Sequence, residues 1–227
     1  MIRSEKGKFI FVHVQKNAGM SFEAILKKNF SDSDHWHGRH GHALTGIREV
    51  GREEWDEYYS FAFVRNPWDR MVSWYSMIQK NLEKLPAAQR ASKEPFINSP
   101  FFNQVVLQSH DFESFLHNCT EVVFDRGCLK SFAFNQMDYL TDERGDIAVS
   151  FVGRFENLIA DSSVVFDQLG IKAGPLGRFF QVDSLPKRNT SQHMHYSHYY
   201  NRETRDLVEK RFEKDIEAFG YHFESPE

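Results

Sequence analysis

The chain has 227 residues, a net charge of −4 from 28 basic and 32 acidic side chains, and 41% hydrophobic residues. This length suits one domain with a substantial core, and the acidic balance excludes a general affinity for nucleic acid, so any phosphate site must be local. The two cysteines, Cys119 and Cys128, exclude a disulfide framework and are expected to be plain thiols. Without a secretory signal or a run long enough to span a bilayer, we expect a soluble, cytoplasmic protein.

The first predicted elements are a strand and a helix that flank a short polar loop. Residues 8–26 read KFIFVHVQKNAGMSFEAIL, in which residues 9–14 are typical of a buried strand and Phe22, Ile25 and Leu26 have helical spacing. Small residues in the loop let the backbone approach a ligand, Ser21 stands where a helix begins, and Lys16 adds a full charge. These features predict an anion site at a helix N-terminus. The alternative is an ordinary turn capped by Ser21.

A histidine-rich stretch follows, SDSDHWHGRHGH, and then a predicted short helix at residues 43–50 and a strand at residues 61–64. The next helix begins at Pro67, a residue favoured at the first helical position. Its predicted apolar stripe consists of Trp68, Met71, Val72, Tyr75 and Ile78.

Arg65 directly follows the predicted strand at residues 61–64, and Ser73 lies eight residues further on. We expect Ser73 to share a polar helix face with Asn66, Asp69 and Arg70. An arginine and a serine in these positions can hold a phosphate, because ligands of open α/β sheets bind beyond the carboxyl ends of the strands. Together with the Lys16 loop, the pair suggests a ligand that carries phosphate at two places.

The remaining elements are less sharply defined. Residues 81–100 predict a surface excursion, residues 101–117 a helix, and residues 119–140 are ambiguous. A third strand is expected at residues 147–152, then a helix near 161–169 that ends at Gly170, and a last helix from Arg202 to Ala218 that ends at Gly220. This alternation predicts an α/β fold, with a mostly parallel sheet covered by helices on both faces, in a single domain over residues 1–227.

Several of these segments resemble a known family. KFIFVHVQKNAGMSFEAIL is similar to the 5′-phosphosulfate loop of carbohydrate sulfotransferases, and FAFVRNPWDRMVSWY is similar to their 3′-phosphate motif. SFVGRFENL, LPKRNTSQH and YYNRETRDLVEKRFEKDIEAFGY resemble later blocks of the membrane-type family, whereas residues 80–140 do not match. The chain is identified as a soluble, bacterial member with a P-loop-like fold. It departs from the pattern at Gln15, Asn17 and Met20, where Pro, Thr and Thr or Gly are expected.

The resemblance implies 3′-phosphoadenosine 5′-phosphosulfate as sulfonate donor and no required metal. Lys16 would neutralise charge on the leaving oxygen, and Arg65 and Ser73 would bind the 3′-phosphate. The implied donor-binding residues are Lys16, Asn17, Ala18, Gly19, Met20, Ser21, Arg65 and Ser73, with Arg188, Asn189 and Thr190 in a loop that could close over the nucleotide. That loop could equally be a polar connection before the last helix.

The acceptor needs a base, and the run HWHGRHGHA offers four histidines. His40-Gly41-His42 resembles the HGH motif of hexuronic-acid 2-O-sulfotransferases, which implies His42 as base and His40 as a substrate-binding or orienting residue. A histidine is chemically apt, because its pKa lies near working pH. A zinc site and a carboxylate base, Glu23 or Glu49, are the alternatives, although Glu23 is more simply an exposed helix residue.

The expected reaction is sulfonate transfer to a hydroxyl, most simply that of a glycan. A phosphotransferase that uses ATP and a nucleotide-binding protein without catalysis are the alternatives. A Walker loop places its lysine after the glycine, whereas this chain places it before, which favours sulfonate transfer over a kinase. The acceptor and the oligomeric state do not follow from the sequence.

Overall fold

A computed structural model describes residues 1–92, 94–96, 99–171 and 194–224. The chain divides into two compact units, the first made of residues 1–65 and 136–190 and the second of residues 66–135 and 191–227. The single functional domain predicted above stays a prediction.

The first unit is built on a five-stranded sheet with the strand order β3-β1-β2-β4-β7. Its strands are β1 (Ile2–Ser4), β2 (Phe9–Val12), β3 (Asp34–His35), β4 (Tyr59–Val64) and β7 (Phe151–Arg154). β2, β4 and β7 run parallel, whereas β1 pairs antiparallel with both β2 and β3. The sheet is therefore mixed rather than mostly parallel. β1 joins β2 through a short turn, as antiparallel neighbours can, whereas β3 follows α1 and pairs with β1 at the edge of the sheet.

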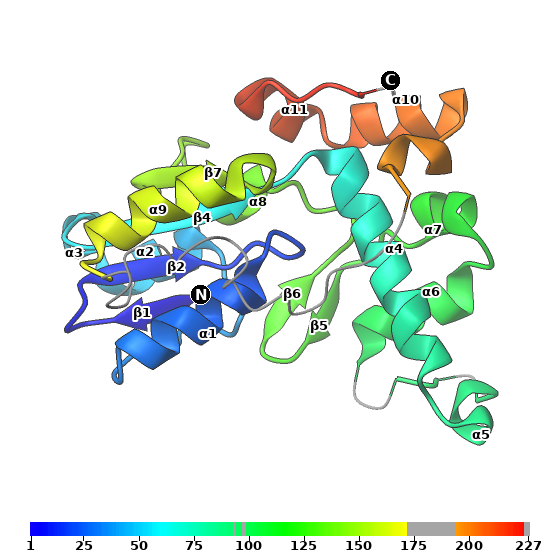
Figure 1. The fold of residues 1–227 in the computed structure, drawn as a ribbon, viewed down its shortest axis with the longest axis horizontal. Helices are drawn as coiled ribbons and strands as arrows, with labels where there is room; N and C mark the ends of the chain where they lie inside the picture. The colour runs from blue at the N-terminus through cyan, green and yellow to red at the C-terminus, as the bar shows by residue number, and fades with distance from the viewer. Residues whose placement is uncertain (93, 97–98, 172–193, 225–227) are drawn as a thin grey trace. The chain divides into compact units, whose positions relative to one another are not determined.

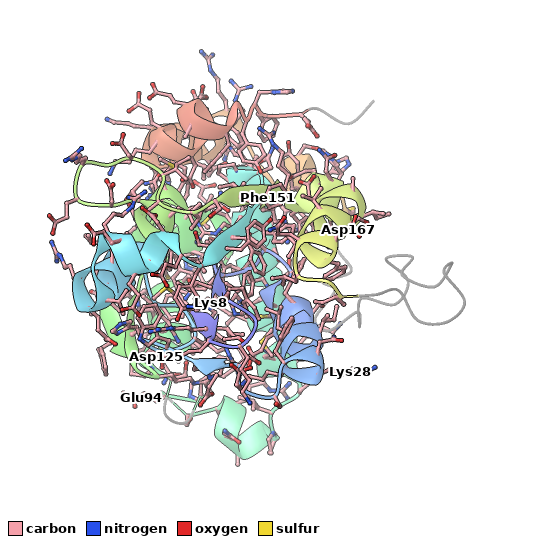
Figure 2. All side chains as sticks on the ribbon, turned by 90° about the vertical axis from the view of Figure 1, so that its left-hand side faces the viewer. Lys8, Lys28, Glu94, Asp125, Phe151 and Asp167 are labelled. Atoms are coloured by element: carbon pink, nitrogen blue, oxygen red, sulfur yellow. The ribbon has the colours of Figure 1, made fainter. Side chains whose placement is uncertain are left out.

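The first unit also contains five α-helices within the described residues. They are α1 (Gly19–Asn29), α2 (Ala43–Val50), α3 (Arg52–Asp56), α8 (Met137–Leu140) and α9 (Leu158–Gln168), with a 3₁₀ turn at Phe155–Asn157. Figure 1 shows β1, β2 and β4 side by side, with α9 running along them. Lys28 of α1 and Asp167 of α9 lie at the surface (Figure 2), so both helices turn a polar side outward.

Aromatic side chains fill one face of this sheet. Alternate residues of β2 and β4 pack with the apolar residues of α1 and α9 in one core cluster, which contains Phe9, Phe11, Phe61, Phe63, Phe22, Ile25, Leu26, Val165 and Phe166. The residues between them on the strands, Ile10, Val12, Ala62 and Val64, are also buried, so the second face of the sheet is covered as well. Burial on both faces explains the continuous apolar runs seen in the sequence.

The second unit is mainly helical. It contains α4 (Pro67–Glu83), α5 (Ala87–Arg90), α6 (Pro100–Gln108), α7 (Phe112–Asn118), α10 (Arg202–Arg211), α11 (Glu213–Phe219), a 3₁₀ turn at Tyr196–Tyr199 and a hairpin of β5 (Val123–Asp125) and β6 (Cys128–Lys130). The predicted stripe of α4 lies in its core, with Trp68, Met71, Val72 and Ile78 buried and Tyr75 packed against them. Cys119 and Cys128 are buried, free thiols.

Candidate functional site

The candidate site lies in the first unit, at the loop between β2 and α1. β2 ends at Val12 and α1 begins at Gly19, with Ala18 as its N-cap, so Ser21 is inside the first turn rather than at the cap. The N–H of Ser21 bonds the carbonyl of Ala18 at 2.9 Å. Gly19 and Met20 precede this bond, in the part of the turn whose N–H donors have no partner inside a helix. Such donors and the helix dipole favour an anion at this end of α1.

Two residues of the loop hold an unusual backbone conformation. Lys16 and Ala18 have φ of 71° and 61°, in the left-handed region that residues with a Cβ seldom adopt. Left-handed residues within a turn aim main-chain N–H groups into a common concavity that suits an anion. Strain of this kind is found at ligand sites, where the surrounding structure keeps it in place.

Gly19 is needed here for space rather than for its backbone freedom. A Cβ on this residue would lie 1.9 Å from Nε2 of His13, a side chain that is only 2% exposed. The His13 ring stacks on Phe11 with ring centroids 5.5 Å apart and meets His40 edge-on at 4.5 Å. Burial holds the pKa of His13 well below its ordinary value, so the ring beside the loop is neutral. Sequence reasoning missed His13, which looks like one more strand residue.

Lys16 is half-buried, and burial together with the nearby Arg65 charge lowers its pKa from 10.5 to about 7. Arg65 follows the last residue of β4 and is 6% exposed. Its Nη1 donates to the carbonyl of Lys16 at 3.1 Å, and its guanidinium lies over the Phe155 ring, 4.0 Å from the centroid. The structure therefore brings two predicted site residues, Lys16 and Arg65, together. An anion near both cations would stabilise their charged forms.

The two amide side chains beside Lys16 point into the protein. Asn17 Nδ2 donates to the carbonyl of Phe63 at 2.7 Å and to Oε1 of Gln136 at 2.8 Å, and the Tyr139 hydroxyl donates to Oε1 of Gln15 at 3.1 Å. Both N–H groups of the Asn17 side chain are thus used inside the protein. A contact of Asn17 with a donor would use its main-chain N–H.

His40 and His42 differ in what fixes them. His40 Nδ1 lies 2.9 Å from the carbonyl of His13, and because a carbonyl can only accept, Nδ1 carries the hydrogen and Nε2 is the basic nitrogen. His42 precedes α2, and its ring lies 4.4 Å from that of Tyr139. Burial lowers the pKa of His42, partly offset by a hydrogen bond with the backbone of Asp138. Both rings are half-buried.

The other two histidines of the stretch are paired with carboxylates. His35 Nε2 lies 2.9 Å from Glu23, and His37 Nε2 lies 2.8 Å from Glu49. Within the described ranges, no group of three or more His, Cys, Asp and Glu side chains is placed to hold a metal ion.

Glu23 is buried, which corrects the expectation of an exposed helix residue. Its carboxylate lies 3.0 Å from Arg39 Nε and 3.2 Å from Lys27 Nζ, in addition to His35. These positive charges hold its pKa below the ordinary value even though burial alone would raise it. A carboxylate held in this way joins α1 to the histidine stretch and is a poor proton acceptor.

The remaining predicted residues lie elsewhere. Ser73 belongs to α4 in the second unit, where it is buried, as is Arg70, whose Nη1 donates to the carbonyl of Phe134 at 3.0 Å. The predicted polar face of α4 is thus largely inside that unit. The predicted loop residues Arg188, Asn189 and Thr190 lie outside the described residues. In the part of the chain that is described, no helix is long and apolar enough to cross a membrane.

Comparison with known protein families gives a match over most of the chain. The family model described as the sulfotransferase family matches residues 1–222. Comparison with curated proteins and with solved structures gave no match. The match covers the loop at residues 13–18, Arg65, the HGH motif and both units.

Proposed function

The chain belongs to the sulfotransferase family, and we propose that it transfers the sulfonate of 3′-phosphoadenosine 5′-phosphosulfate to a hydroxyl group, most simply that of a glycan. The observation that supports this donor is the turn in which two left-handed residues, Lys16 and Ala18, precede α1 while Arg65 bonds the carbonyl of Lys16. Backbone donors, a helix N-terminus and two cations suit a phosphosulfate better than a neutral ligand.

The donor supplies a sulfonate that is activated by its bond to phosphate. The main-chain N–H groups of Gly19 and Met20 and the charge of Lys16 are proposed to bind its 5′ end. As an oxygen leaves the sulfur, Lys16 neutralises the charge that develops on it, and only this differential stabilisation speeds the reaction. Arg65 is proposed to bind the 3′-phosphate, and Ser73 keeps the same proposed role on the strength of the sequence motif.

A histidine of the HGH motif is proposed as the base that takes the proton from the acceptor hydroxyl as its oxygen bonds to sulfur. His42 is the first assignment, because the resemblance implies it and because burial keeps its ring neutral near pH 7. His40 is the alternative, because its bond to the carbonyl of His13 leaves Nε2 as the basic nitrogen. A neutral, oriented imidazole is what proton abstraction needs.

Calorimetric titration with adenosine 3′,5′-bisphosphate, adenosine 5′-phosphate and ATP tests the donor. The proposed function expects the bisphosphate to bind most tightly, without added magnesium. Tighter binding of ATP would favour the phosphotransferase and overturn the proposal. An acceptor screen with sulfur-labelled donor then tests the reaction, and labelled ester on glycan hydroxyls is the expected result. Bisphosphate binding with no transfer to any acceptor would leave a nucleotide-binding protein.

A further inference from the structure

Lys16 is flanked by two buried amide side chains that are held from one short helix. Gln15 is 2% exposed and accepts from the Tyr139 hydroxyl, whereas Asn17 is 1% exposed and donates to Gln136. Gln136 is the N-cap of α8 and Tyr139 lies in its only turn, three residues further on. Residues three apart on a helical turn face the same side, so one side of α8 contacts the loop both before and after Lys16.

The orientation of the Gln136 amide follows from its backbone partners. The N–H of Arg65 donates to Gln136 Oε1 at 2.9 Å, and Gln136 Nε2 donates to the carbonyl of Arg65 at 2.8 Å. A backbone N–H can only donate and a carbonyl can only accept, so the amide cannot be turned over. Oε1 must then receive Nδ2 of Asn17, which sets the Asn17 amide as well.

These contacts close a ring. Asn17 bonds Gln136, Gln136 bonds both backbone groups of Arg65, and the Arg65 guanidinium returns to the carbonyl of Lys16. Gln136 and Tyr139 are completely buried, so water does not compete for these bonds. Hydrogen bonds in a network of low dielectric reinforce one another, and a missing member leaves its partners unsatisfied.

We propose that Gln136 and Tyr139 are positioning residues of the donor site, which hold the loop on both sides of Lys16 and so keep the Lys16 backbone left-handed. That the ligand of this site is the sulfonate donor rests on the proposed function. Its physical basis is the strain at Lys16 and Ala18, because a non-glycine loop of this shape persists only where the surrounding contacts over-determine it. α8 supplies those contacts through Gln136 and Tyr139, which are completely buried.

The test compares Tyr139→Phe and Gln136→Met with variants that remove a similar bond elsewhere. Tyr58→Phe is the matched control for the tyrosine, since its buried hydroxyl accepts from Arg3 at 2.7 Å beside the other end of β4. Gln104→Met is the control for the glutamine, since this buried amide donates to the carbonyl of Glu121 in the second unit.

Hydrogen exchange of the peptide that contains residues 13–19, measured without nucleotide, is the first readout. We expect exchange about tenfold faster in each of the two variants and no change in either control, because one lost buried hydrogen bond corresponds to about that factor. In a Gln15→Met background, which lacks the same bond, Tyr139→Phe should add nothing. A loop that exchanges no faster in Tyr139→Phe than in Tyr58→Phe would overturn the proposal, whatever the folding of Gln136→Met.

Affinity for adenosine 3′,5′-bisphosphate is the second readout. We expect it to fall about tenfold in Tyr139→Phe and Gln136→Met, while both controls bind as the wild type does. Unchanged affinity in a variant with faster loop exchange would overturn the positioning role. A wild type that does not bind the nucleotide would instead refute the proposed function, and the exchange result would still decide whether α8 holds the loop.

Discussion

At the scale of single residues, Lys16 and Arg65 bring two positive charges to one turn of backbone, and burial makes the charge of Lys16 costly. Burial, together with the neighbouring charge of Arg65, lowers the pKa of Lys16 to about 7. An anion that binds there removes the cost, so ligand binding and protonation of Lys16 are linked. The two residues are thereby prepared for a polyanionic ligand before it arrives.

Donor binding above neutral pH should therefore take up a proton. At pH 8 most Lys16 side chains are neutral in the free protein, since the pKa is about 7, and an anionic ligand raises that pKa. Calorimetry with the bisphosphate in triethanolamine and in Tris buffers, both cationic and so unable to compete for an anion site, should give different heats, equivalent to an uptake approaching one proton. The difference should vanish in Lys16→Met. Equal heats in both buffers for the wild type would contradict the linkage.

The lowered pKa of Lys16 also predicts how the stability of the fold depends on pH. Because the folded-state pKa of Lys16 is lower than its ordinary 10.5, the unfolded chain binds more protons between about pH 7 and pH 10.5. This group therefore makes the fold more stable as pH rises through that window, and the gain is lost as pH falls. Lys16→Met should remove this contribution and raise the melting temperature at pH 7. Melting curves at pH 7 and pH 9 check both effects, and Lys28→Met is the exposed-lysine control.

The base should produce an acid limb in kcat/KM. His42 must be neutral to accept a proton, and since burial lowers its pKa, activity should fall with decreasing pH only below about 6.5. His42→Asn should lower kcat about 10²–10⁴-fold and remove the limb, with bisphosphate affinity unchanged. If His40→Asn removes the limb and His42→Asn does not, the base is His40. His37→Asn is the control, because its ring pairs with Glu49.

Arg65 should discriminate between nucleotides. Loss of a charge-assisted contact costs about 1.5–3 kcal/mol, so Arg65→Ala should weaken the bisphosphate by at least tenfold and adenosine 5′-phosphate by much less. Isothermal titration of both nucleotides measures this. Arg48→Ala removes an exposed arginine that pairs with Glu143 and should change neither affinity. An equal loss for both nucleotides would mean that Arg65 acts only through the carbonyl of Lys16.

At the scale of elements, the N-terminal end of α1 packs against His13, the residue after β2, only because Gly19 has no side chain. Gly19→Ala would press a Cβ into the His13 ring, and overpacking of this kind costs about 1–3 kcal/mol. Urea denaturation should show that loss, and His13→Ala in the same chain should relieve most of it by opening the space. A Gly19→Ala protein as stable as the wild type would show that the ring moves aside freely.

The sequence predicted the elements that carry strong local signals. The helix at 43–50 has the predicted bounds, the helix from Pro67 begins where expected, and Gly220 ends the last helix with φ of 63°. The helix predicted at residues 101–117 is broken in two at Ser109 to Asp111, and the last predicted helix, from Arg202 to Ala218, is broken in two at Phe212. In the first, Asp111 begins a new helix with a capping box, a competing signal within a continuous apolar pattern.

The sequence named the cations of the candidate site, whose role stays a prediction, but not the residues that hold the loop around them. Lys16, Arg65 and the HGH motif stand beside recognisable turns, whereas Gln136 and Tyr139 lie in a stretch with no clear period. The departures at Gln15 and Asn17 have a local explanation, since both side chains are partners of α8. Nothing in the sequence marks a pairing between residues 119 positions apart. The sheet edge formed by β1 and β3 was missed because strands of two or three residues have almost no pattern.

At the scale of the whole molecule, the first unit is assembled from two separate stretches of chain. β1, β2 and β4 precede the second unit, whereas α8, β7 and α9 follow residues 66–135. The chain leaves the first unit after Arg65 and returns to it at Gln136, and these two residues are bonded to each other.

This arrangement sets an order of events during folding. The loop around Lys16 is present in the first few residues made, yet its supports at Gln136 and Tyr139 are separated from it by 119 and 124 positions. Closing such distant contacts carries an entropic penalty that local helices do not face, so the ligand-binding conformation should form late. After dilution from denaturant, far-UV circular dichroism should recover first and bisphosphate binding only afterwards. A nascent chain would thus carry its lysine long before it could hold a nucleotide.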